Sequence, residues 1–222
     1  MKTKIISITF LLFVFTTMSY AQNNEEILSD STNEWFAVQS VNLVVGYYSP
    51  EMAYWNDTYL PAKGITESFG GSAVFGANIT FSIHSNFRAR VGASYWKGEV
   101  EGNQESKIDG LKIGFTRFSL GLLYGPKVFS FSGFQPYLGA EATAFLINNE
   151  YNINNEMISQ NGQDMSFAPV LGIDKAFGAV NIGIEAKYNL GNYIQEETFI
   201  ETVEREVGIN GAEISFSIGY RF

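Results

Sequence analysis

The sequence predicts an all-β protein, an eight-stranded antiparallel up-and-down transmembrane β-barrel. Apolar and polar residues alternate with a period of two in eight segments, which is typical of strands that have one apolar face. The connections between these segments are alternately short and long, as in an up-and-down sheet. Among the 222 residues, 45% are hydrophobic and 15% aromatic, which is enough to form a large core and excludes a disordered polar chain.

The first 21 residues have the pattern of a secretory signal peptide. Lys2 and Lys4 precede an apolar run over residues 5–15, and the segment closes with Ser19-Tyr20-Ala21. The run is about half of the roughly 20 residues that a membrane helix needs. We expect residues 1–21 to be a signal peptide, 22–34 a flexible, polar, periplasmic N-terminal tail, and 35–222 the barrel domain.

Two neighbouring segments give the clearest alternation. Residues 73–83 place Ala73, Phe75, Ala77, Ile79, Phe81 and Ile83 on one face. After residues 84–86 the same parity resumes, with Phe87, Ala89, Val91, Ala93 and Tyr95 on the apolar face. This pattern predicts a hairpin with a tight turn.

The other six predicted strands follow the same rule. They cover residues 41–47, 118–124, 137–146, 167–174, 180–188 and 213–222. Pro169 weakens the sixth of the eight strands, because proline removes a donor from the ladder.

The predicted connections separate the two ends of the sheet. Short links cover 84–86, 175–179 and a somewhat longer 125–135, whereas long polar loops cover 49–70, 98–110, 147–165 and 191–210. Closure of eight strands into a barrel removes both sheet edges.

Periodicity alone leaves open whether the apolar face points inward or outward, and three features favour outward. The polar face is rich in glycine and other small residues, which suit a narrow lumen. Tyrosines and a phenylalanine near the strand ends lie on the apolar face, where membrane barrels have their aromatic girdles. The polar face also carries charges of both signs. These predicted lumen residues are Arg88, Arg90, Arg117, Glu141, Asp174, Glu185, Lys187, Glu213 and Arg221. Because an eight-stranded interior is just wide enough for side chains, we expect these charges to pair and to close the lumen.

The last residues, Ile214-Ser215-Phe216-Ser217-Ile218-Gly219-Tyr220-Arg221-Phe222, resemble the closing strand of bacterial outer-membrane β-barrels. The segment Gln135-Pro136-Tyr137-Leu138-Gly139 also resembles this group. With the signal peptide and the loop asymmetry, the resemblance points to the small OmpA/OmpX/OmpW-like proteins and to porin-family "outer membrane β-barrel domain" proteins. It implies a monomer in the outer membrane of a Gram-negative bacterium, in contact with lipid and lipopolysaccharide. It also implies that Tyr220 and Phe222 form the signal read by the barrel-assembly machinery.

The sequence does not favour catalysis, a cofactor or a metal site. The single histidine, His84, lies in the shortest turn, where a turn residue is more plausible than a general base. Glu196, Glu197, Glu201, Glu204 and Glu206 match no calcium-loop spacing and suit a solvated acidic loop. The formal charge of −9 disfavours nucleic acid as a partner.

The aromatic residues of the first long loop allow two interpretations. They form a contact surface for a partner or saccharide, or they pack over the barrel mouth. These residues are Tyr48, Met52, Tyr54, Trp55 and Tyr59.

We therefore expect a non-catalytic outer-membrane barrel with a structural or surface-interaction role, whose long loops are available to an extracellular ligand. One alternative is a narrow OmpW-like channel for small or apolar solutes. A less favoured alternative is a secreted, soluble, lipocalin-like binding barrel.

Overall fold

A computed structural model describes residues 36–84, 86–103, 106, 108–153, 156–197 and 203–222. The predicted signal peptide and N-terminal tail, residues 1–34, lie outside the described residues. No helix within the described ranges has both the length and the apolar character needed to cross a membrane.

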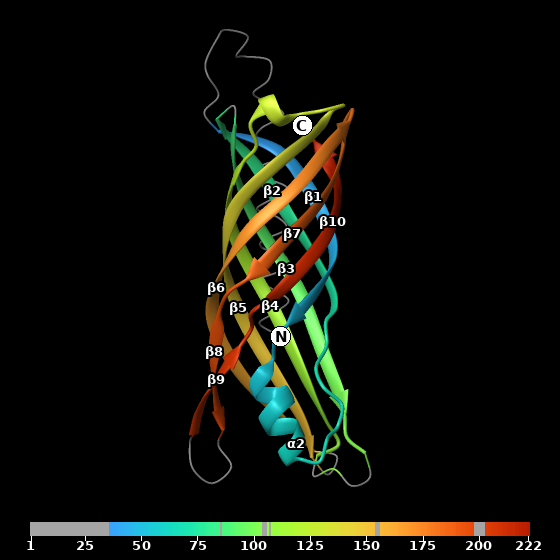
Figure 1. The fold of residues 1–222 in the computed structure, drawn as a ribbon, viewed down its shortest axis with the longest axis vertical. Coiled ribbons are helices and arrows are strands. Elements are labelled where there is room, and N and C mark those ends of the chain that lie inside the picture. Colours follow the sequence, from blue (N-terminus) through green and yellow to red (C-terminus); the bar gives the residue numbers. More distant parts are fainter. Residues whose placement is uncertain (1–35, 85, 104–105, 107, 154–155, 198–202) are drawn as a thin grey trace, which may run out of the picture. The chain divides into compact units, whose positions relative to one another are not determined.

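Eight antiparallel strands form a closed barrel, which confirms the predicted fold class (Figure 1). Around the barrel the order is β1-β10-β7-β6-β5-β4-β3-β2. Pairing of β1 with β10, from Ser40 opposite Arg221 to Pro50 opposite Gly211, closes the ring. The strands are β1 (Ala37–Pro50), β2 (Ser72–His84), β3 (Phe87–Glu101), β4 (Gly110–Tyr124), β5 (Phe134–Ile153), β6 (Glu156–Phe177), β7 (Val180–Asn189) and β10 (Gly211–Arg221).

The two ends of the barrel differ. The end that we call the turn end carries the C-terminus, the 3-10 helix η2 (Lys127–Phe129) and the two-residue turn between β6 and β7. In that turn Gly178 has φ +61°, a conformation that favours glycine. The opposite end, the loop end, carries the π-helix η1 (Tyr54–Tyr59), helix α2 (Leu60–Ala62) and the separate hairpin of β8 (Asn192–Glu197) and β9 (Val203–Gly208) (Figure 1).

Three of the predicted long loops are wrong in part, because a part of each is strand. β3 extends to Glu101 and β4 begins at Gly110, so the predicted loop 98–110 shortens to 102–109. β5 and β6 remain paired as far as Ile153 opposite Glu156, which replaces the predicted loop 147–165. The predicted loop 191–210 contains the β8–β9 hairpin.

Pro169 lies inside β6, and the structure shows how the strand accommodates it. On the β5 side the register continues through Ala140 opposite Pro169. On the β7 side the ladder stops at Val170 opposite Lys187 and resumes as a single bridge between Phe167 and Leu190. The proline therefore interrupts one ladder locally, as expected for a residue without an N–H.

Polarity inverts along the barrel wall, and β3 shows this most simply. Towards the turn end, Arg88 and Arg90 point inward and are buried, while Tyr95 on the outside is 48% exposed. Beyond Tyr95 the same two faces exchange character. The inward Trp96 and Val100 are buried and apolar, and the outward side chains of Lys97 and Glu99 are 44% and 36% exposed.

The exposed apolar band marks the part of the wall that lies in lipid. Around the barrel, large apolar side chains point outward with about half of their surface exposed, among them Leu43, Phe75, Leu120, Leu138, Leu171 and Ile218. Soluble proteins rarely expose so continuous an apolar surface, because its contact with water is unfavourable, whereas the lipid-facing wall of a membrane barrel is apolar. The outward-apolar prediction is therefore confirmed, and the soluble lipocalin-like alternative does not fit.

A hydrophobic core fills the barrel at the loop end. Trp96 stacks on Phe115 with ring centroids 4.8 Å apart, and the indole N–H of Trp55 donates to the hydroxyl of Tyr193 at 2.8 Å. Burial raises the pKa of Tyr193, so its hydroxyl stays protonated. Four of the first-loop residues are buried in or beside this core: Tyr48, Met52, Trp55 and Tyr59. They pack over the barrel mouth, and the contact-surface interpretation is wrong for them.

The position of the lipid boundary can be tested on β5, where Ala142 and Asn152 both point outward and are exposed. Ala142→Lys places a cation within the apolar band, and we expect it to lower the free energy of unfolding by about 2–4 kcal/mol. Asn152→Lys, the matched control beyond the band, should change it by less than about 0.5 kcal/mol. Urea unfolding in lipid vesicles measures both. Equal losses in the free energy of unfolding for the two variants would mean that the lipid boundary does not lie between Ala142 and Asn152.

Candidate functional site

The charged residues predicted for the lumen come from six strands. Period-two alternation turns Arg88 and Arg90 of β3 to the same side as Arg117 of β4 and Glu141 of β5. Antiparallel pairing then fixes their heights. Glu213 of β10, for example, lies directly opposite Lys187 of β7.

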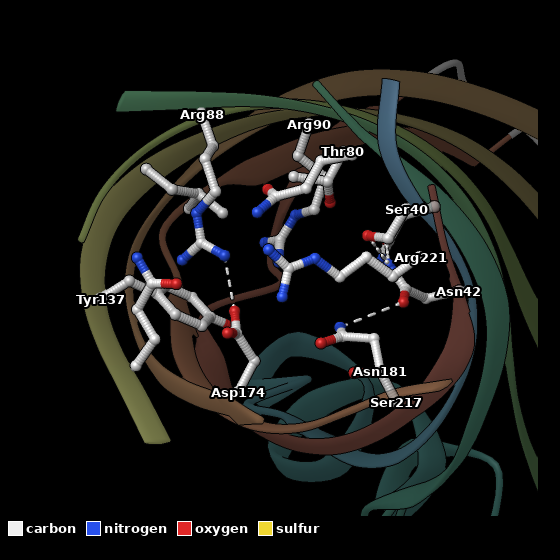
Figure 2. Close-up of a pocket in the computed structure, with 14 residues that line it drawn as sticks. Ser40, Asn42, Thr80, Arg88, Arg90, Tyr137, Asp174, Asn181, Ser217 and Arg221 are labelled. Atoms are coloured by element: carbon white, nitrogen blue, oxygen red, sulfur yellow. Dashed lines mark hydrogen bonds and ion pairs between the residues drawn. The ribbon is translucent and has the colours of Figure 1, made fainter. Parts of the chain in front are cut away.

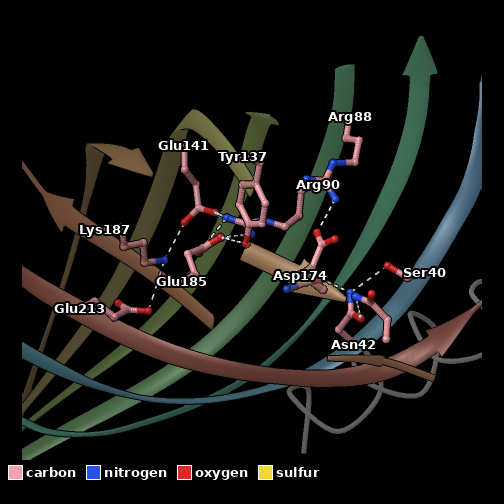
Figure 3. A network of polar contacts seen from close by, with 12 residues as sticks. Ser40, Asn42, Arg88, Arg90, Tyr137, Glu141, Asp174, Glu185, Lys187 and Glu213 are labelled. Carbon is pink, nitrogen blue, oxygen red and sulfur yellow. Dashed lines mark hydrogen bonds and ion pairs between the residues drawn. The ribbon is translucent and has the colours of Figure 1, made fainter. Parts of the chain in front are cut away.

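Six of these residues form one continuous ion network, and Figure 3 labels all of them except Arg117. Arg90 bonds to Glu141 at 2.8 Å and to both oxygens of Glu185. Lys187 contacts Glu141 at 2.8 Å and Glu213 at 3.3 Å, and Glu213 accepts from Arg117 at 2.6 Å. The network contains three cations and three carboxylates and is therefore neutral. None of the six side chains is more than 11% exposed.

A glycine on β6 makes room for a ring beside the network. Gly121 on β4, by contrast, lies between Arg90 and Glu141, and a Cβ there would meet both side chains at ordinary contact distances. At Gly172 a Cβ would lie 2.3 Å from the ring of Tyr137, which lies across this glycine. The position of the ring lets the Tyr137 hydroxyl donate to Glu185 at 2.9 Å.

Arg117 joins the network to the apolar core. Besides Glu213 it donates from Nε to Ser94 at 3.0 Å. Its guanidinium lies 5.2 Å from the ring centre of Tyr48 and 5.9 Å from that of Phe145, which are cation–π distances. The charged and apolar fillings of the lumen are therefore in direct contact.

A separate ion pair lies nearer the turn end. Arg88 bonds to Asp174 at 2.6 Å, and its guanidinium lies 4.6 Å from the ring centre of Tyr137. Both residues line a cavity of about 40 Å³, together with Asn42, Asn181 and Arg221 (Figure 2). Arg221 is exposed, and among the described residues it makes no ion pair.

The structure thus brings eight of the nine predicted lumen charges into two groups and leaves Arg221 apart at the mouth. Tyr137 was not predicted as a member. Its position on the polar face of an alternating strand is the signal that could have identified it. Likewise, Asn42 donates to Ser40 at 3.0 Å and to Asn78 at 2.9 Å, forming an amide cluster that charge counting does not detect.

A second charge cluster lies on the outside of the loop end, beyond the lipid band. Glu99 accepts from Lys97 at 2.8 Å and from Lys112 at 2.7 Å. Hydrogen bonds from these two lysines, Lys112 first, hold the pKa of Glu99 below its usual range. Any stability gained is present at neutral pH and is lost as the pH falls through that lowered pKa. Because these side chains are more than a third exposed, the gain is small.

The remaining predicted residues lie at the periphery. Tyr220 and Phe222 point outward, 56% and 51% exposed, with their rings 5.0 Å apart. His84 ends β2 at the turn end. In the acidic cluster, Glu206 accepts from Asn192 at 2.6 Å, and the side chains of Glu196, Glu197, Glu201 and Glu204 lie outside the described residues.

A double-mutant cycle on Glu141 and Lys187 tests the network. Glu141→Ala leaves two buried cations short of one carboxylate each, and we expect a loss of about 3 kcal/mol in the free energy of unfolding. Adding Lys187→Met should restore part of it, giving a coupling energy above about 1 kcal/mol. The control Glu99→Ala, in the exposed cluster, should cost less than about 1 kcal/mol. Additive effects at Glu141 and Lys187 would contradict a coupled network.

Comparisons with known proteins agree on the fold. No family model and no curated protein matches the chain. Among solved structures, outer membrane protein OprG from Pseudomonas aeruginosa is 15% identical, with a TM-score of 0.59 over 83% of this chain and 96% of its own. Outer membrane protein AlkL is 16% identical with a TM-score of 0.48, over 90% and 96%. Neisserial surface protein A is 16% identical with a TM-score of 0.46, over 84% and 97%. At 15% identity the likeness to OprG shows the fold, which is that of a small bacterial outer-membrane β-barrel. The fold agrees with the lipid-facing wall and confirms the predicted class.

Proposed function

We propose that the protein is a non-catalytic outer-membrane barrel that is closed along its axis and acts through its loop end, in a structural or surface-interaction role. The observation that carries this proposal is that two successive layers of side chains fill the lumen. An ion network occupies the barrel at the level of the lipid band, and a hydrophobic core occupies it above.

Each layer opposes the passage of solutes in a different way. To open the ion network, buried pairs would have to separate at a cost of several kcal/mol. Two cavities among the lumen charges, each of about 40 Å³, suit a few water molecules. Above them, the fully buried Trp96, Phe115 and Phe145 fill the lumen with apolar side chains.

The asymmetry of the two ends supports an orientation. Short turns face the periplasm in bacterial barrels, and longer connections face the exterior. The loop end would then be extracellular, and the outward charged cluster of Lys97, Glu99 and Lys112 would lie beside lipopolysaccharide head groups. Any extracellular ligand would meet this polar band, the β8–β9 hairpin and the surface around η1.

The channel alternative requires a continuous route through the lumen, and the filled interior weighs against it. The non-catalytic assignment rests on the chemistry of the site. The lumen carboxylates are neutralised by cations, and the single histidine lies at the turn end, away from the extracellular surface.

Conductance tests the closed lumen. In planar lipid bilayers the wild-type protein should show no steady single-channel conductance. Arg90→Ala combined with Glu141→Ala should also remain closed, because the apolar layer stays in place. Steady conductance steps from the wild-type protein would favour the channel and reject the closed barrel.

We also propose that the outward Tyr220–Phe222 pair is recognised by the barrel-assembly machinery. Deletion of Phe222 should lower the amount of folded protein in cells, measured by heat-modifiable gel mobility, while refolding in detergent is little changed. Phe177→Ala is a suitable control, because Phe177 is also outward and 54% exposed at the turn end but lies in β6. Equal losses in cells and in detergent would mean that Phe222 serves packing alone.

A further inference from the structure

The charges inside the barrel do not balance completely. The six-residue network is neutral, and so is the pair of Arg88 with Asp174. Arg221 therefore leaves these nine lumen positions with one uncompensated positive charge. The whole chain, by contrast, has a formal charge of −9, so this site differs in sign from most of the protein.

The excess charge lies at a built cavity, which we call the vestibule: the cavity at the turn end lined by Arg88, Arg221, Asp174, Asn42 and Asn181. Figure 2 shows the guanidinium groups of Arg88 and Arg221 turned toward its middle. Arg88 is 8% exposed, and one of its terminal nitrogens, Nη2, has no hydrogen-bond partner among the residues that the structure describes. A buried, unpartnered guanidinium N–H is costly and calls for an acceptor.

We propose that the vestibule binds a small oxyanion, a carboxylate or a phosphate-type group, through Arg221 and Arg88. The N–H groups of two guanidinium groups can donate charge-assisted hydrogen bonds to the oxygens of such an anion. The amide cluster of Asn42 and Asn181 offers further polar contacts on the opposite wall. Asp174 satisfies one nitrogen of Arg88 and limits the site to a single anionic group.

The ligand is a free oxyanion of the surrounding solution, because the vestibule lies at the mouth of the barrel where Arg221 is exposed. There Ser40 lies opposite Arg221, and the Phe222 N–H donates to the Gln39 carbonyl.

Binding of inorganic phosphate tests the site. The chain from residue 22 onward is refolded in dodecyl maltoside and titrated at constant ionic strength, with ³¹P line broadening as the readout. We expect saturable binding that weakens about tenfold in Arg221→Gln, the effect of one lost charge-assisted contact. Arg221→Lys should retain part of the affinity. Lys127→Gln removes a cation from η2 at the same end and should bind as the wild type does.

Heat-modifiable mobility confirms that each variant is folded. Absence of saturable binding in the wild type, or equal affinity in folded Arg221→Gln, overturns the proposal.

Discussion

The change of solvent along the barrel wall, from lipid to water, is the constraint on which the rest of the structure depends. A side chain facing lipid must be apolar, and one facing water above the bilayer is stable when polar. Successive residues of a strand point to opposite faces. Where the outward residues are apolar, the inward residues are therefore polar, and where the outward residues are polar, the inward residues are apolar. On β3 the exchange occurs between Tyr95 and Lys97 on the outside, and between Arg90 and Trp96 on the inside.

The charges in the lumen have a structural reason beyond pairing. A strand that slips by one residue moves every side chain to the other face. If the lumen were apolar at the level of the lipid band, the two faces of each strand would be similar and the register poorly specified. With Arg90, Glu141 and Lys187 on one face, a slip would place charges in lipid. The ion network thus defines the inside of the barrel, even though buried pairs are weak evidence of added stability.

The two fillings also assign different tasks to the two ends. At the loop end, Trp55 and Tyr59 pack into a core like that of a water-soluble protein, and they fix η1 and α2 over the mouth. At the turn end the lumen opens into a polar vestibule with excess positive charge. Under the proposed function, a closed axis with one open, charged end would bind at the turn end and make contacts at the loop end, without transport between them.

The sequence by itself determined the number of barrel strands and their antiparallel order, because these follow from period-two alternation and from the connections between the segments. The outward direction of the apolar side needed more than periodicity. It was indicated by the small residues, the charges of both signs and the aromatic residues on the two faces, which also indicated the inward charges. The partners of those charges were decided only by the tertiary structure, because Arg90 meets Glu185 through register and strand tilt across the barrel. Strand length was misjudged for a related reason. On the loop-end side of Tyr95, Phe118 and Leu146 the alternation continues, but the outward residues are polar and the inward residues apolar. In the sequence these stretches look like polar loops. The closed barrel shows that they are strands whose outer face meets water instead of lipid.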